Sequence, residues 1–282
     1  MERRVWRVID SGAGDAAWNM ALDEALLTLA GRGGIPPALR FFSWEKPSLS
    51  IGSFQKTDEL DMERIRREQV PFVRRPTGGR AVLHDAELTY SVACPIPSPF
   101  FPSDLMGSYK TTGACFLRGL GLIGVDAALV PVSKNPDRKK ANPMRGGNPL
   151  CFSSPSWYEV LLGGKKLIGS AQRRLKDSFL QQGSLLIELD IPGLLSFMTF
   201  PDDAAREMAH QALSGKMTAL NAQLSSSINI TDLQAALIKG FAGELGAEFV
   251  ESAPTEEEVK LAERLLHEKY SRAEWNIFRT AP

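Results

Sequence analysis

The period of the hydrophobic pattern changes along this chain, and the change limits the folds that the chain can adopt. Segments such as "WRVIDSG" and "ELTYSVAC" alternate apolar and polar residues, as strands with one buried face do. From about residue 191 the period becomes helical, and two segments there open with capping-box sequences, Thr231 with Gln234 and Thr255 with Glu258. The pattern therefore predicts strands in the first two thirds of the chain and helices at its end.

Helical segments also interrupt the strand-rich part. "DAAWNMALDEALLTLAG" places its apolar residues on one face, with Asp15 as a cap and Gly31 just past the end. "DELDMERIRREQ" is expected to form a short amphipathic helix, and "SYKTTGACFLRGLGLIGV" a helix with its cysteine on an apolar stripe. We predict an α+β fold with mixed, largely antiparallel sheets flanked by helices. Residues 1–200 would form the core and residues 201–282 a mainly helical C-terminal part.

Charge and cysteine content exclude several classes of protein. With 33 basic and 33 acidic residues the net charge is zero, so we expect neither nucleic acid nor a membrane as a partner. No apolar run approaches the roughly 18 to 20 residues of a membrane-spanning helix, and "MERRVWRVID" lacks the apolar stretch of a secretory signal. Three cysteines, far apart, argue against a disulfide scaffold and for a reducing, cytoplasmic setting.

The few histidines offer no metal site. His84, His210 and His267 are the only histidines, and none has a second ligand at metal-site spacing. We therefore expect no bound metal.

A glycine pair lies between two strand-like segments in "RRPTGGRAVLHD". Without a Cβ, Gly78 and Gly79 allow a ligand to approach their backbone N–H groups closely. Arg74, Arg75 and Arg80 add fixed positive charge around them. The sequence is neither a Walker loop nor a G-x-G-x-x-G fingerprint. Such a pair is more often a tight hairpin whose neighbouring charges are solvated, and a substrate-binding loop is the alternative.

Two potential nucleophiles lie further along, in "PLCFSSPSWYEVLLGGKKLIGSAQRR". Cys151 lies in a polar, basic and turn-rich context, which is typical of a reactive thiol rather than a structural one. Cys94 and Cys115 lie in apolar segments and are expected to be structural. Lys166 follows a Gly-Gly hairpin turn, either as a partly desolvated amine or as one of two solvated lysines.

Taken together, these motifs resemble a known superfamily. "NMALDEALL", "RRPTGGRAVLHDAELTYSV", "GGKKLIGSAQRR", "LQQGSLLIELD" and "AEWN" are similar, in order, to the biotin/lipoate protein ligases and lipoyl (octanoyl) transferases. "CFSSPSWYEV" with TGGR looks closest to the cysteine-dependent octanoyltransferases of Gram-positive type. Those enzymes move octanoate from acyl carrier protein to a lysine of the glycine-cleavage H protein, without ATP or another cofactor.

The resemblance implies roles for individual residues. Cys151 matches the acyl-carrying nucleophile and Lys166 the lysine that tunes it. Arg80 departs from the ATP-dependent ligases, which carry a third glycine at its position. Residues that match segments lining the acyl pocket are Arg74, Arg75, Thr77, Gly78, Gly79, His84, Gly169 and Ser170.

Several alternatives remain open at this stage. The chain would bind octanoyl-acyl carrier protein and H protein as a monomer, and basic residues in "SKNPDRKKANPMR" would either steer the acidic carrier protein or form a solvated loop. An ATP-dependent lipoate ligase, an octanoyl amidotransferase between lipoyl domains, and a non-enzymatic lipoyl-domain binder are the competing hypotheses.

Overall fold

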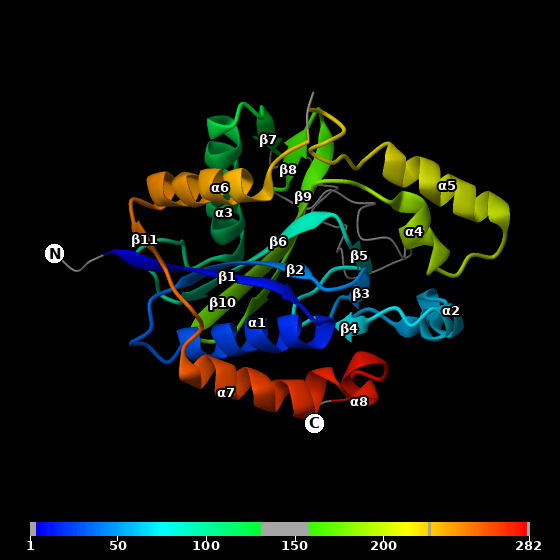
Figure 1. Ribbon diagram of the computed structural model, residues 1–282, viewed down its shortest axis with the longest axis horizontal. Coiled ribbons are helices and arrows are strands. Elements are labelled where there is room, and N and C mark those ends of the chain that lie inside the picture. Colours follow the sequence, from blue (N-terminus) through cyan, green and yellow to red (C-terminus); the bar gives the residue numbers. More distant parts are fainter. Residues whose placement is uncertain (1–3, 131–157, 225–226, 281–282) are drawn as a thin grey trace.

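A large mixed sheet forms the centre of the computed structural model, which describes residues 4–130, 158–224 and 227–280 (Figure 1). The two pairs that involve β1 are parallel and the remaining pairs are antiparallel. In spatial order the strands are β11 (Glu248–Glu251), β1 (Val5–Gly14), β2 (Ala38–Trp44), β6 (Glu87–Pro95), β10 (Ser178–Leu186), β9 (Lys165–Arg174), β8 (Val160–Leu162) and β7 (Ala127–Leu129).

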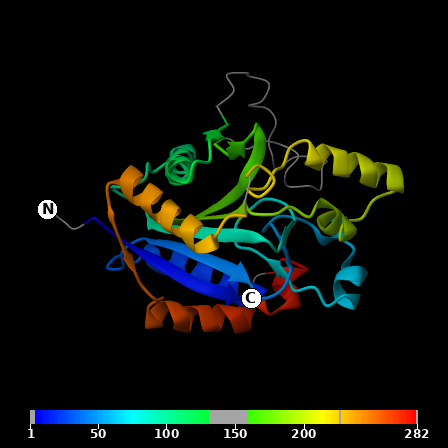
Figure 2. The same cartoon turned by 45° about the horizontal axis from the view of Figure 1, so that its top comes forward.

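Helices cover both faces of this sheet (Figures 1 and 2). On one face, α3 (Leu105–Leu122) and α6 (Ile230–Leu245) pack on each other and on the sheet. On the other face, α1 (Ala16–Ala30) contacts the sheet, and α7 (Glu256–Leu265) lies against α1 on its far side. The alternation along β2 explains both layers, because Leu39 and Phe41 join the α3 side whereas Ala38 and Phe42 join the α1 side.

A second, three-stranded sheet lies beside the large one, in the order β4 (Phe72–Arg74), β3 (Ser48–Ile51) and β5 (Val82–His84). Apolar side chains of β3 and of the neighbouring helices form a separate cluster there. The helices that accompany this sheet are η1 (Thr57–Glu59), α2 (Met62–Arg67), α4 (Ile191–Ser196) and α5 (Asp203–Ser214).

Two of the three helix N-caps predicted from the sequence are present in the structure. Asp15 caps α1 by accepting hydrogen bonds from the backbone N–H groups of Ala17 and Trp18 in its first turn, and Thr255 and Glu258 form the expected capping box of α7. The box predicted at Thr231 is wrong. The side chain of Asn229 caps α6 instead, because it accepts from the backbone of Thr231 and Asp232.

The C-terminal part extends the sheet and also packs on the helices. β11 pairs in parallel with β1, and the π-helical turn η3 (Leu266–Tyr270) and α8 (Ala273–Asn276) follow α7. Figure 1 shows α8 below β4, with the C-terminus nearby. The predicted α+β class, with largely antiparallel sheets and C-terminal helices, is confirmed. The boundary at residue 200 stays a prediction.

One strand differs from its sequence pattern. "ELTYSVAC" predicts a half-buried strand, but every residue from Glu87 to Cys94 in β6 is buried. Leu88, Tyr90, Val92 and Cys94 face the α3 side. Polar residues such as Thr89 and Ser91 face α1 and the small sheet. A polar face hidden from water requires internal hydrogen-bond partners.

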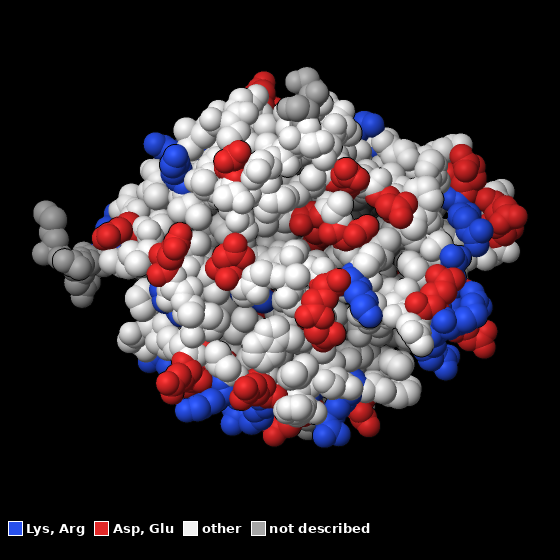
Figure 3. All heavy atoms as spheres, in the orientation of Figure 1, with Lys and Arg blue, Asp and Glu red and all other residues white. Residues whose placement is uncertain are grey.

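Charged side chains are unevenly distributed on the face that Figure 3 displays. Acidic side chains predominate across its middle, whereas acidic and basic side chains intermingle along its lower and right-hand parts. In the described parts of the chain, no helix combines the length and apolar character needed to cross a bilayer.

Candidate functional site

The glycine loop connects β4 and β5, and it is not a tight hairpin. These two strands lie on opposite sides of β3 and do not pair with each other. The loop continues alongside the end of β3, because Ser53 N–H donates to the Thr77 carbonyl over 2.8 Å. Gly79 has a φ of +97°, which favours glycine. A Cβ on Gly52 would lie 2.1 Å from the Gly79 carbonyl oxygen, so Gly52 is also needed for this close approach.

The side chain of Arg75 fixes the conformation of the glycine loop through hydrogen bonds to its backbone. Its guanidinium donates to the Gly78 carbonyl over 2.8 Å, to the Arg80 carbonyl over 2.7 Å and to Ser50 Oγ over 3.0 Å. The side chain is buried, which excludes the alternative of a solvated charge at this position. A planar guanidinium with several donors suits the fixing of several carbonyls at once.

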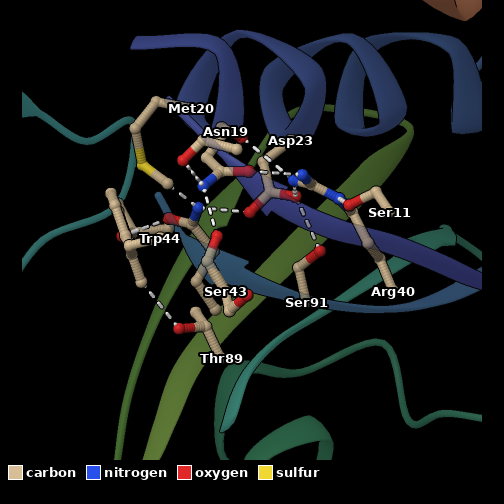
Figure 4. A network of polar contacts seen from close by, with 12 residues as sticks. Ser11, Asn19, Met20, Asp23, Arg40, Ser43, Trp44, Thr89 and Ser91 are labelled. Carbon is tan, nitrogen blue, oxygen red and sulfur yellow. Dashed lines mark hydrogen bonds and ion pairs between the residues drawn. The ribbon is translucent and has the colours of Figure 1, made fainter. Parts of the chain in front are cut away.

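Thr77 connects the loop to a buried polar network. Figure 4 shows the part of this network that lies beneath α1, around Asp23 and Arg40. Its hydroxyl donates to Gln182 Oε1 over 2.8 Å, and the Gln182 amide in turn donates to Asp23. Asp23 forms a fully buried ion pair with Arg40 at 2.7 Å, and Ser91 donates to the same carboxylate. Because each member of a buried network needs its partners, the position of Thr77 depends on residues in α1, β2 and β10.

The side chains of Arg74 and Arg80 take no part in the hydrogen bonds of Arg75 and Thr77 just described. Burial lowers the pKa of Arg74 to about 10, with a smaller contribution from the charge of Arg279. The Arg74 guanidinium donates to backbone carbonyls, among them Gln55 at 2.6 Å and Trp275 at 3.0 Å. Arg80 is half-buried and forms a 3.2 Å ion pair with Glu59. Neither side chain lines the cavity described next.

A cavity lies between the two sheets, and five residues predicted from sequence line it. They are Arg75, Thr77, His84, Gly169 and Ser170. Gly78 and Gly79, from the adjoining loop, do not line it themselves. Apolar side chains complete the wall, namely Met20, Phe42 and Trp44 on the α1 side and Val82 from the small sheet. The cavity therefore combines an apolar surface with a few polar groups, as ligand pockets do.

Gly169 and Ser170 reach the cavity because β9 approaches β10 closely at Gly183. A Cβ on Gly183 would lie 2.6 Å from the Gly169 carbonyl oxygen and 2.5 Å from Tyr90 Cε1. The Ser170 hydroxyl and Tyr90 Oη share a 2.7 Å hydrogen bond, and burial raises the pKa of Tyr90 to about 12. Tyr90 is therefore a neutral hydrogen-bonding partner at neutral pH.

His84 is held on three sides. Its Nε2 lies 2.7 Å from Ser50 Oγ, its Nδ1 lies 2.7 Å from Glu87 Oε1, and its ring stacks on Trp44 at a centroid distance of 4.0 Å. Burial alone would raise the pKa of Glu87, but the charge of His84 and hydrogen bonds from His84, Thr89 and Ser184 outweigh it and lower the pKa. Glu87 is thus a buried carboxylate.

Lys166 is buried, which excludes the hypothesis of two solvated lysines for this residue. It is 5% exposed, and its ammonium forms an ion pair with Glu159, which is 6% exposed. Lys165, its neighbour, donates to the Ser214 carbonyl over 2.8 Å. Lys166 and Ser170 belong to the same strand, four positions apart, or roughly 13 Å along β9. Cys151, with the basic segment before it, lies outside the described residues.

The two described cysteines are structural, as expected. Burial raises the pKa of Cys94 to about 12 and that of Cys115 further still, so neither thiol ionises at neutral pH. Within residues 4–130, 158–224 and 227–280, no group of three His, Cys, Asp or Glu side chains could hold a metal ion.

Sequence inspection missed several residues of this site. Ser50, Glu87, Gln182 and Glu159 were read only as parts of strands or hairpins. The available signal was the polar half of the alternating strands, because Ser50 and Gln182 line the cavity and Glu87 is buried beside it rather than exposed to water.

Comparisons with known proteins agree with this geometry. Residues 15–242 match the family described as the lipoyl protein ligase A/B catalytic domain. An octanoyltransferase LipM of Anoxybacillus flavithermus is 41% identical over 99% of this chain and 100% of its own length. The octanoyltransferase LipM of Bacillus subtilis is 36% identical over the same shares.

Solved structures give the same family. A bi-partite lipoate protein ligase of Thermoplasma acidophilum has a TM-score of 0.79 at 26% identity, covering 100% of this chain and 98% of its own. A lipoate-protein ligase A bound with ATP has a TM-score of 0.75 at 26% identity, covering 99% and 100%. The resemblance seen in the motifs, and the enzyme of acyl-transfer type that it implied, are confirmed by the named relatives. The chain belongs to the family of lipoyl protein ligase A/B catalytic domains.

Proposed function

We propose that this protein transfers an octanoyl group from octanoyl-acyl carrier protein to a lysine of the glycine-cleavage H protein, through a thioester on Cys151. The observation that carries the proposal is the full-length similarity to octanoyltransferases at 41% identity, compared with 26% for the lipoate ligases. The product would be an octanoylated lipoyl domain, an early step in making the lipoate cofactor.

In the first half-reaction the Cys151 thiolate attacks the donor thioester. The C–S bond to the carrier is broken as a new C–S bond forms, and the leaving group is itself a thiolate, so the exchange is nearly balanced. An ordinary thiol is only a few per cent ionised at neutral pH. The Lys166 ammonium would favour the thiolate, and its ion pair with Glu159 fixes the ammonium in position.

In the second half-reaction a neutral lysine amine of the acceptor attacks the acyl-Cys151 carbonyl. A C–N bond forms, the C–S bond breaks, the amine nitrogen releases one proton to solvent, and the thiolate of Cys151 is regenerated. An amide is more stable than a thioester, so no nucleotide is needed. Donors to the oxyanion would come from Lys166 and from backbone N–H groups near Gly78, Gly79 or Gly169, each worth about 3 to 4 kcal/mol.

The acyl chain would lie in the cavity between the two sheets. Met20, Phe42 and Val82 offer apolar contact there, and each buried CH₂ contributes about 0.8 kcal/mol. Arg75 and Thr77 would fix the glycine loop against the carbonyl end. Arg74 and Arg80 would support the shape of the loop without touching the acyl group. The Arg74 side chain binds the C-terminal segment, and that of Arg80 binds Glu59.

Partner recognition would use charge. Acyl carrier proteins are acidic, and residues 134–145 carry five basic residues against one acidic residue, namely Lys134, Arg138, Lys139, Lys140 and Arg145 against Asp137. A basic segment close in sequence to Cys151 would steer an acidic donor toward the thiol. Reversing these charges should slow transfer from the carrier protein, more so at low salt.

A specific observation also favours a second candidate, an ATP-dependent lipoate ligase. The solved neighbours are lipoate ligases, and one of them was determined with ATP bound. Arg80 argues against it, because the sequence resemblance implies a third glycine there in ATP-dependent ligases, and the arginine adds bulk and charge where an adenylate would pack against bare backbone. An octanoyl amidotransferase between lipoyl domains would use the same cysteine and differ only in its donor.

A nucleotide-free transfer assay tests the proposal. Octanoyl-acyl carrier protein is offered with apo-H protein and, separately, with a dehydrogenase lipoyl domain, and the acyl-enzyme is sought by intact-protein mass spectrometry. Parent enzyme should gain one octanoyl group and pass it to H protein, and Cys151→Ala should do neither. Cys94→Ala, which removes a buried thiol, is the matched control. Transfer that needs ATP and survives Cys151→Ala would establish the ligase instead.

A further inference from the structure

A line of hydrogen bonds runs from the glycine loop across β10 to helix α1. Thr77 Oγ1 donates to Gln182 Oε1 over 2.8 Å, and Gln182 Nε2 donates to the carboxylate of Asp23 in α1. Thr77 and Gln182 both line the cavity, and both are almost completely buried. The bond between them therefore joins the glycine loop to the large sheet at the wall of the cavity.

Asp23 is held in place by a buried ion pair (Figure 4). Arg40 donates to its carboxylate over 2.7 Å, and the same guanidinium donates to Asn19 Oδ1 over 2.7 Å and to Ser11 Oγ over 2.9 Å. Both members of the pair are 0% exposed. A fully buried ion pair adds little net stability over apolar side chains of the same size. What this pair supplies is a hydrogen-bond acceptor held at one position.

The hydrogen bonds of Gln182 can run in only one direction. As the ion-pair partner of Arg40, Asp23 is a carboxylate that can only accept, so Gln182 turns its amide nitrogen toward it. The same nitrogen donates to Met20 Sδ over 3.5 Å. The amide oxygen is left facing Thr77, whose hydroxyl must donate to it. Asp23 therefore determines, through Gln182, how the glycine loop is bound to the sheet.

The glycine loop is also bound on its other side, to the small sheet. The N–H of Ser53, just past the end of β3, donates to the Thr77 carbonyl over 2.8 Å. Arg173 of β9 approaches the Pro76 carbonyl at 3.5 Å, a longer contact than the Thr77–Gln182 bond. Loss of the bond to Gln182 would thus free the loop from β10 while its bonds to the small sheet remain.

We propose that Gln182, oriented by Asp23, is a positioning residue for octanoyl transfer, because it holds the glycine loop against the large sheet. The proposal rests on the proposed function, in which the acyl chain lies in this cavity and backbone N–H groups of the loop meet its carbonyl. A loop bound to both sheets keeps these donors in place before the substrate arrives, so no rearrangement is needed during the reaction.

Removal of single hydrogen-bonding groups tests the proposal. Thr77→Val and Gln182→Met each delete the bond and nearly keep the size of the side chain. Both should speed hydrogen exchange at the amides of residues 77–81, measured by mass spectrometry on the full-length protein. Both should also lower kcat/KM for octanoyl-acyl carrier protein by about 5- to 10-fold. Thr77→Ser, which keeps the hydroxyl, should stay close to the parent in both measurements.

An exchange of amide and carboxylate tests the role of Asp23. Gln182→Glu sets a second carboxylate against Asp23, and neither group can donate to the other, so transfer should fall further than in Gln182→Met. Adding Asp23→Asn returns one amide to the pair, with its N–H groups now on the α1 side. Loop exchange and transfer should then move back toward the parent. A folded double variant that performs no better than Gln182→Glu would overturn the role of Asp23.

Ser178→Ala is the matched control, because it also removes a buried bond between β10 and α1. Its hydroxyl donates to the Leu27 carbonyl over 2.7 Å, outside the lining of the cavity, so loop exchange and transfer should stay as in the parent. Parental loop exchange or parental transfer in Thr77→Val and Gln182→Met would overturn the proposal. A parent enzyme without nucleotide-free transfer would instead overturn the proposed function, and the exchange measurement would still test how Gln182 holds the loop.

Discussion

Arg74 and Arg75 are adjacent in the sequence, yet their guanidinium groups bind different parts of the molecule. Arg74 reaches the carbonyls of Trp275 and Gln55, and so holds the end of the chain against the small sheet. Arg75 turns the other way and holds Ser50 and the glycine loop at the cavity. Successive residues at the end of a strand point to opposite sides, and here each side has its own function.

Exchanging each arginine for lysine should separate these functions. Lysine retains the charge but cannot bind several carbonyls in one plane. Arg74→Lys should lower the melting temperature and speed hydrogen exchange at the amides of residues 275–280, with the octanoyl-transfer rate little changed in the remaining folded protein. Arg75→Lys should instead reduce transfer and leave the exchange of residues 275–280 as in the parent. The same exchange pattern in both variants would contradict this separation.

The buried pair of Lys166 and Glu159 predicts a distinctive stability pattern. Lys166→Met leaves the Glu159 carboxylate buried without its lysine, which should lower the free energy of unfolding by about 3 to 5 kcal/mol. Adding Glu159→Gln should recover part of that loss. Lys165→Met is the control and should lose about 1 kcal/mol, because only a hydrogen bond to the Ser214 carbonyl disappears. Urea denaturation measures all four proteins.

The same variants test the role of Lys166 in ionising Cys151. Alkylation by iodoacetamide at neutral pH should slow in Lys166→Met and stay at the parent rate in Lys165→Met. Cys94 and Cys115 contribute little background, because burial keeps both thiols protonated. Equal alkylation rates in Lys166→Met and the parent would mean that another group ionises the thiol.

The close packing around Gly183 predicts that a single added methyl group there lowers stability. In Gly183→Ala the new Cβ would meet the Gly169 carbonyl oxygen and the Tyr90 ring, so β9 must move away from β10. We expect a loss of about 1 to 3 kcal/mol in unfolding free energy and a higher KM for the acyl donor, because Ser170 moves with the strand. Gly121→Ala in α3 is the control. Its Cβ meets open space, so stability should be unchanged or rise by up to about 1 kcal/mol.

The lowered pKa of Glu258 leads to a prediction of how the free energy of unfolding depends on pH. Burial alone would raise its pKa, but hydrogen bonds from Arg7 and Thr255 and the charge of Arg7 lower the pKa below its ordinary value of 4.5. A carboxyl with a lowered folded-state pKa stabilises the protein above its unfolded-state pKa and loses that contribution as pH falls through the folded-state value. Glu258→Gln should therefore be destabilised most at neutral pH, by about 3 kcal/mol.

The difference between parent and Glu258→Gln should shrink as the pH falls below 4.5, because the parent carboxyl then becomes protonated. Urea denaturation at several pH values between 7 and 3 measures this. Glu256→Gln, which changes an exposed carboxylate on the same helix, should show little effect at any pH. A constant difference across the pH range would mean that the charge of Glu258 contributes nothing.

Local patterns were sufficient for most of the secondary structure and for the candidate list. Asp15 and the Thr255–Glu258 box specify helix starts through contacts between near neighbours, so their sequence alone identifies them. The motifs around Gly78 and Gly169 identified the family because they are long and occur in order. The sequence predicts Thr231 as the cap of α6, but Asn229, two residues earlier, takes that place, because both residue types can cap a helix.

Only the tertiary structure decided what each polar side chain does. The alternation in β6 is the same whether its polar face meets water or protein, and here α1 and the small sheet cover Glu87 and Thr89 and place them behind the cavity. Likewise, sequence could list Arg74 and Arg75 together, but partners about 200 residues away and 25 residues away separated them. The sequence by itself determined periodicity, capping and family. Burial and long-range partners, which periodicity does not encode, determined the site.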